Sequence, residues 1–194
     1  MNYFARFEEV SGQLFRFDTR IYLESLNLNF ESVCVGAIVG KNPGSASPNA
    51  LNQFLPLDLN RDQMLPFVGN RFLDGYKRAK KSIPPNAFVR VWNLFYVCNP
   101  NLGAALKIAS KIPHLPTCPS ENDSVSLVWY GWGGNNTELN PYKVRYLQKK
   151  HRNQFFYNHR SAVIVQNVPA VADFAKHTQG MPTEPVVQYL AKVL

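Results

Sequence analysis

The chain has 194 residues, of which 45% are hydrophobic and 18% charged, so its composition excludes a disordered tail and a low-complexity fibre. A chain of this length is expected to form a single domain spanning residues 1–194. Lys and Arg number 21 against 13 Asp and Glu, which gives a formal net charge of +8 and favours a polyanionic partner such as DNA. A solvated basic surface is the alternative explanation of that charge.

The N-terminal residues 1–30 are expected to form edge strands or a hairpin beside the main sheet. Within them, residues 13–22 alternate Phe15 and Phe17 with polar residues, which is typical of a strand with one buried face. Buried strands are predicted further along, because short β-branched runs stand between turn residues. These runs are residues 33–39, 88–95, 125–130 and 162–166.

Helical segments are predicted between and after these strands, at residues 71–80, 102–111, 141–153, 170–177 and 185–194. The last helix has Thr183 as a plausible N-cap, Glu184 in its first turn and Pro185 at an early helical position. Strands that alternate with helices predict a parallel sheet covered on both faces. The expected fold is therefore a three-layer α/β/α domain around a four-stranded, mainly parallel sheet.

The sequence shows no pattern that is typical of a membrane span, a metal site or a cofactor site. No apolar run approaches the roughly 18 residues that cross a bilayer, and the N-terminus lacks the pattern of a signal peptide, so we expect a cytoplasmic protein. The three cysteines lack metal-binding or redox spacing and are expected to be reduced thiols. The four histidines are scattered, and we expect neither a metal nor a cofactor.

Two long loops, residues 41–71 and 113–123, are rich in Pro, Asn and Ser. In open α/β sheets, ligands bind beyond the carboxyl ends of the strands, so residues that follow a strand are the candidates for a site. The turn after the first buried strand, residues 40–45, has neither the glycine spacing of a dinucleotide fingerprint nor the Gly-Lys-Ser ending of a P-loop.

Five short motifs lie near the predicted strand ends. They are Gly40-Lys41-Asn42-Pro43-Gly44, Gly69-Asn70-Arg71-Phe72, Val91-Trp92-Asn93-Leu94, the apolar run 127–133 ending in Gly131-Trp132-Gly133, and Gly180-Met181-Pro182-Thr183. In this order they resemble motifs of the uracil-DNA glycosylase superfamily, and most closely its mismatch-specific uracil and thymine branch. The pattern also resembles an uncharacterised bacterial and phage family with a Leu-Asn-Pro-Ser turn, an Asn-Leu-Phe strand and a C-terminal Gly-x-Pro segment.

The glycosylase resemblance implies a monofunctional enzyme that flips a mismatched, damaged or modified pyrimidine out of DNA and excises it. Hypermodified bases of phage DNA are among the substrates that this hypothesis includes, and antiphage defence is among the roles. Asn42 would be catalytic by holding a water, and Glu184 would supply a carboxylate near the sugar. The base-binding residues implied are Lys41, Asn70, Phe72, Asn93 and Trp132. The alternatives are core packing for the aromatic residues and a strand-end hydrogen bond for Asn93. Lys41 would then be a solvated loop lysine, and Glu184 an ordinary partner of the helix dipole.

DNA contacts are expected from loop and helix residues next to these motifs. The residues implied are Gly44, Ser45, Lys77, Arg78, Lys80, Lys81, Met181, Pro182 and Thr183. A glycosylase of one domain would act as a monomer. Two other functions remain open: a nucleic-acid-binding module that has lost catalysis, and an enzyme that acts on a free nucleoside or a related small ligand.

Overall fold

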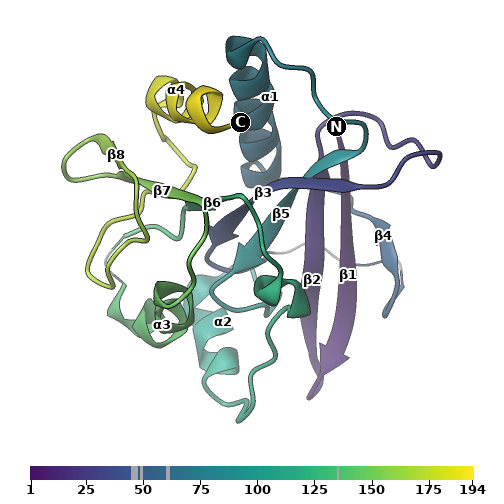
Figure 1. Ribbon diagram of the computed structural model, residues 1–194. Helices are drawn as coiled ribbons and strands as arrows, with labels where there is room; N and C mark the ends of the chain where they lie inside the picture. The colour runs from purple at the N-terminus through teal and green to yellow at the C-terminus, as the bar shows by residue number, and fades with distance from the viewer. Residues whose placement is uncertain (45–47, 49, 60–61, 135) are drawn as a thin grey trace.

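The computed structural model describes residues 1–44, 48, 50–59, 62–134 and 136–194. Within these residues, eight strands form one sheet in the order β4-β1-β2-β5-β3-β6-β7-β8 (Figure 1). The strands are β1 (Asn2–Val10), β2 (Gln13–Tyr22), β3 (Val33–Gly40), β4 (Phe54–Pro56), β5 (Ala87–Asn93), β6 (Leu127–Tyr130), β7 (Asn153–Asn158) and β8 (Val163–Val165).

The sheet is mixed. The neighbours β5-β3-β6-β7 are parallel, whereas the other four pairings, β1-β2, β1-β4, β2-β5 and β7-β8, are antiparallel. The predicted α/β class is confirmed. The predicted four-stranded, mainly parallel sheet is wrong, because antiparallel strands extend the parallel block on both sides.

The N-terminal prediction of a hairpin is confirmed by the antiparallel pairing of β1 with β2. An edge position for residues 13–22 is wrong, since β2 lies between β1 and β5 inside the sheet. Residues on both faces of β2 are consequently buried, including Phe15, Arg16 and Phe17. The inner position of β2 thus places the charged residue Arg16 in the interior of the protein.

The C-terminal half of the sheet also differs from the prediction. The helix expected over residues 141–153 ends at Leu147, and the strand β7 begins at Asn153. Phe155 and Phe156 lie on opposite faces of β7 and are both fully buried, which is typical of a strand inside a covered sheet. Residues 162–166, predicted as a central strand, contribute only the antiparallel strand β8.

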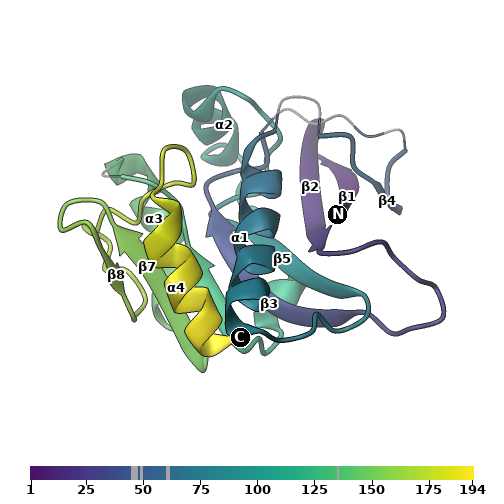
Figure 2. The same cartoon turned by 90° about the horizontal axis from the view of Figure 1, so that it is seen from above.

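Helices cover both faces of the sheet. Helices α1 (Met64–Ala79) and α4 (Thr183–Val193) lie side by side on one face and pack through Phe72, Tyr76 and Leu190 (Figure 2). On the other face, α2 (Leu102–Ala109) and α3 (Asn140–Leu147) enclose a second core with the short 3-10 helices η1 (Pro119–Asn122) and η2 (Thr137–Leu139). None of the helices in the described ranges is long and apolar enough to cross a membrane.

Helix α1 begins earlier than predicted, because Asp62 caps its first turn. The Oδ1 atom of Asp62 accepts hydrogen bonds from the backbone N–H groups of Met64 and Leu65 at 2.8 and 3.2 Å. The Gly69-Asn70 motif therefore lies inside a helix and not in a loop.

Two other local predictions are wrong. Residues 170–177 form no helix, because Ala175 bridges to Gly133 and Asn158 and the backbone N–H of Lys176 donates to Tyr157. The N-cap of α4 is Pro182 and not Thr183. The Thr183 hydroxyl instead accepts a hydrogen bond from Arg71 at 2.5 Å.

Candidate functional site

A cavity of about 520 Å³ opens where β3 and β5 end. Its wall is formed by residues 42–44 after β3, Asn93 at the end of β5, residues 62–64 and Phe67 at the start of α1, and residues 177–181. Arg16 of the N-terminal hairpin completes the wall. The cavity has the size and the position at the strand ends that are usual for small-ligand sites in α/β proteins.

Asn93 is the most deeply buried polar residue of this wall, with 1% of its surface exposed. Its side-chain oxygen lies against Gly40 on the neighbouring strand, where a Cβ atom would come within 3.0 Å of it. A side chain at position 40 would therefore crowd the amide. The amide nitrogen of Asn93 has no hydrogen-bond partner among the described residues. A buried donor without a partner is costly to the fold and marks a place where a ligand can accept a hydrogen bond.

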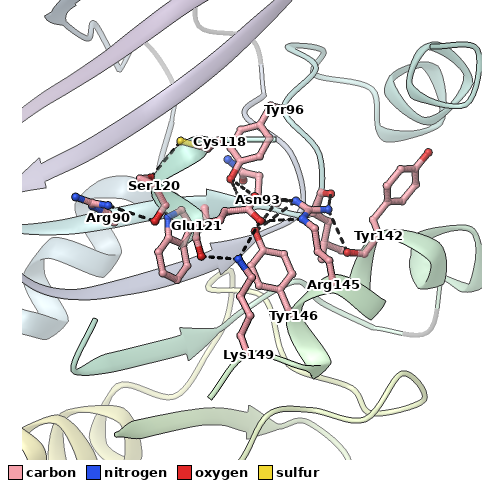
Figure 3. Close-up of polar contacts among 12 residues, drawn as sticks. Arg90, Asn93, Tyr96, Cys118, Ser120, Glu121, Tyr142, Arg145, Tyr146 and Lys149 are labelled. Carbon is pink, nitrogen blue, oxygen red and sulfur yellow. Dashed lines mark hydrogen bonds and ion pairs between the residues drawn. The ribbon is translucent and has the colours of Figure 1, made fainter. Parts of the chain in front are cut away.

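A buried polar network holds the backbone carbonyl of Asn93 in place (Figure 3). The carbonyl oxygen of Asn93 accepts from Arg145 Nη2 at 2.5 Å and from the Tyr146 hydroxyl at 3.0 Å. Glu121, only 4% exposed, accepts from Arg145 Nε and Nη2 at 2.9 and 3.0 Å and from the Tyr96 hydroxyl at 2.6 Å. These bonds fix the strand end that carries the Asn93 amide.

Charge on Arg145 is maintained within this network. Burial alone would lower the pKa of Arg145, but its hydrogen bonds to the Glu121 carboxylate and the charge of that carboxylate raise it above its ordinary value. Burial also raises the pKa of Tyr96 and of Tyr146, so both hydroxyls stay protonated at neutral pH and can donate. Glu121 and Tyr96 were not predicted as site residues, because nothing in their local sequence distinguishes them.

Asn42, which the glycosylase resemblance implies to be catalytic, lies in the cavity wall. Its amide nitrogen donates to the backbone oxygen of Asn99 at 2.8 Å, which fixes the orientation of the side chain. Gly44 and Met181 also border the cavity. Ser45 lies outside the described residues.

The aromatic residues expected to stack on a base are elsewhere. Phe72 and Trp132 are fully buried in the two cores on opposite faces of the sheet. Phe67, five residues before Phe72 on α1, is the aromatic side chain in the described cavity wall. It is partly buried and lies beneath the guanidinium of Arg71, whose carbon is 5.0 Å from the ring centre. Phe67 is therefore a better candidate for stacking.

Other expected site residues do not border this cavity. Asn70 is exposed on α1, and Lys41 points toward Gly133, where burial lowers its pKa. Both oxygens of Glu184 bind Arg78, at 2.6 and 2.9 Å, on the surface between α4 and α1. The fold thus gives Glu184 an ion pair and not a place beside a sugar.

The basic residues expected to contact DNA, Lys77, Arg78, Lys80 and Lys81, also lie apart from the cavity. Lys77 is 13 residues after Met64, or about 20 Å along the axis of α1 at 1.5 Å per residue. Lys77, Arg78 and Lys80 border a second cavity of about 450 Å³ with Thr183 and Glu184, while Lys81 and Pro182 are exposed. Any contact of these residues with DNA would be made at a distance from the first cavity.

His177 gives the first cavity a titratable group with an unusual pKa. Burial and the charge of Lys41 lower the pKa of His177 from 6.5 to about 4, against the opposing effect of Asp62. The imidazole is therefore neutral at pH 7 and adds no positive charge to the wall.

Replacement of His177 by Gln should reduce the acid sensitivity of the protein. Because the pKa is lower in the folded chain, the unfolded chain takes up the proton first, and the folded state loses stability as the pH falls from about 6.5 to about 4. The loss amounts to at most about 3 kcal/mol, at 1.36 kcal/mol per pKa unit. Urea unfolding at pH 7 and pH 4.5 measures it. His114→Gln, on the exposed loop, is the control, and equal pH dependence of the wild type and His177→Gln would refute the assignment.

Compared with protein-family models, curated proteins and solved structures, the chain matches none. Within the described residues, no group of three or more His, Cys, Asp or Glu side chains could hold a metal ion.

Proposed function

We propose that the protein is a monofunctional DNA glycosylase that excises a flipped pyrimidine base. The observation that carries the proposal is the meeting of Asn42 and Asn93, from two motifs far apart in the sequence, at one cavity in which the Asn93 amide donor has no partner among the described residues. A pyrimidine carbonyl oxygen is a suitable acceptor for that donor.

The proposed reaction breaks the bond between C1′ of the sugar and the ring nitrogen of the base. The electron pair of this bond leaves with the base, the oxygen of a water molecule bonds to C1′, and the proton that the water loses ends on the base, so the products are a free base and an abasic site. Asn93 stabilises the departing base, and Asn42 positions the water. An amide is a poor general base, so we expect slow turnover on unmodified DNA.

A carboxylate near the sugar would stabilise the positive charge that develops there. In the described cavity wall this carboxylate is Asp62, and not Glu184 as expected from the sequence. Asp62 Oδ1 is engaged by the first turn of α1, which fixes the carboxylate at the edge of the cavity.

The proposal is tested with DNA that contains uracil, mismatched thymine or modified cytosine, and with phage genomic DNA, followed by detection of abasic sites. Asn93→Ala and Asn42→Ala should each lower the rate of excision at least about 100-fold, the usual effect of removing one stabilising donor. Asn70→Ala, which changes an exposed Asn of α1, is the matched control and should retain full activity. Salt-sensitive DNA binding without abasic sites on any substrate would instead identify a binding module.

An enzyme acting on a free nucleoside or nucleotide is the second candidate. The position of Lys77, Arg78 and Lys80 at the far end of α1 favours it, because a strand in the first cavity would not pass directly over these residues. Such an enzyme should release the base from a nucleoside and show little salt-dependent DNA binding.

A further inference from the structure

Arg16 is a charged residue in the interior of the protein. It lies between Phe15 and Phe17 on β2, whose rings pack in the core beneath α2 and α3, while Arg16 borders the cavity near the start of α1. Only 3% of its surface is exposed. Among the described residues, neither its Nε nor its Nη1 atom has a hydrogen-bond partner.

The surrounding groups satisfy Arg16 poorly. Its Nη2 atom lies 4.0 Å from Asp62 Oδ2, which is too far for a hydrogen bond, and Asp62 Oδ1 already caps α1. Burial lowers the pKa of Arg16, while the Asp62 carboxylate raises it, and an Arg with one carboxylate nearby remains charged. Burial also raises the pKa of the Cys98 thiol to about 11, so the thiol is neutral and no counter-ion.

Both buried side chains with unpartnered nitrogens in this wall, Arg16 and Asn93, offer donors. A ligand that satisfies both must present acceptor oxygens at two points. The neutral His177 adds no positive charge, so Arg16 is the cation of the described wall, and its partner Asp62 is too distant to neutralise it by contact. Anionic oxygens are the natural partners of a guanidinium.

We propose that Arg16 binds a phosphate group of a nucleotide ligand whose base lies against Asn93. The phosphate site follows from Arg16 itself, whereas the pyrimidine character of the nucleotide rests on the proposed function. The phosphate belongs either to a free nucleotide or to the strand that carries a flipped base. The N-terminal hairpin is then part of the binding site.

Calorimetric titration of the full chain tests the proposal. The probes are the deoxynucleosides of uracil, thymine and cytosine, their 5′-monophosphates, inorganic phosphate, and trinucleotides of the same bases that have only internal phosphates. For wild type, a phosphate should strengthen binding at least tenfold over the matching nucleoside. In Arg16→Met this advantage should fall below twofold. Arg20→Met is the matched control, because Arg20 lies on the same strand against Phe54 and Phe88 and should keep the full advantage.

The trinucleotides identify the source of the phosphate. If the trinucleotides bind in a way that depends on Arg16, the phosphate belongs to a nucleic-acid strand. If only the monophosphates bind in this way, the phosphate belongs to a free nucleotide. Arg16→Lys, which keeps the charge with fewer donors, should retain part of the advantage and keeps the test valid if Arg16→Met fails to fold.

Three results would overturn the proposal: equal binding of nucleosides and nucleotides by wild type, no binding of any phosphate-bearing probe at millimolar concentration, or an undiminished advantage in folded Arg16→Met. The outcome is separable from that of the excision assay. Nucleotide binding that depends on Arg16 without any abasic sites would reject the glycosylase alone, and excision that is unaffected in Arg16→Met would reject the phosphate site alone.

Discussion

Glu121→Gln should lower the free energy of unfolding by about 3 kcal/mol or more. Glu121 is 4% exposed and binds Arg145 through both carboxylate oxygens. Loss of its charge leaves a largely buried guanidinium without its counter-ion, and breaking a buried ion pair in this way typically costs about 3–5 kcal/mol. Chemical denaturation followed by tryptophan fluorescence measures the change.

The same substitution should also weaken ligand binding in the protein that remains folded, because Arg145 and the Tyr146 hydroxyl hold the carbonyl of Asn93. Glu138→Gln, at an exposed position of η2, is the control and should change stability by less than about 0.5 kcal/mol. A Glu121→Gln protein as stable as wild type would show that the network contributes little to the fold.

Phe72→Ala should mainly lower the stability of the protein, whereas Phe67→Ala should mainly impair ligand binding or excision. Phe72 is fully buried, and its ring lies so close to Gly36 that a Cβ there would come within 3.1 Å. Its loss should cost about 3–5 kcal/mol of stability, as for other buried Phe residues. Phe67 borders the cavity, so Phe67→Ala should impair ligand binding or excision with a smaller loss of stability.

The comparison uses thermal unfolding together with the nucleotide titration or the excision assay for both variants. Leu73→Ala, on the same helix but away from the cavity, controls for general loosening of α1. If Phe72→Ala were as stable as wild type but lost binding, the base would stack on Phe72 and not on Phe67.

The sequence predicted the three strands β3, β5 and β6 well, because each is a continuous apolar run whose burial on both faces follows from its composition. The strand β7 was not predicted, because it begins with the polar residues Asn153 and Gln154 and only then has the buried pair Phe155 and Phe156. Pairing between distant strands decided that segment, and local sequence does not report such pairing.

The same division applies to the cavity. Asn42 and Asn93 were predicted from two of the short motifs that resemble those of the glycosylases, and both lie in the cavity wall. Arg16 reaches the cavity only through the antiparallel pairing of β2 with β5, and Phe67 only because Asp62 starts α1 early enough to place it in the first turns. The positions of Arg16 and Phe67 depend on tertiary contacts, which short motifs do not report, so the motifs pointed to Phe72 instead.

The hairpin that contributes Arg16 also has a consequence for folding. The contacts of β1 with β2 are local and should form early, whereas the parallel pairings of β5, β3, β6 and β7 close long loops and should form slowly. The wall of the cavity joins Arg16 near one end of the chain to residues 177–181 near the other. The cavity is therefore complete only when contacts that span most of the sequence have formed, so binding competence requires the whole domain to be folded.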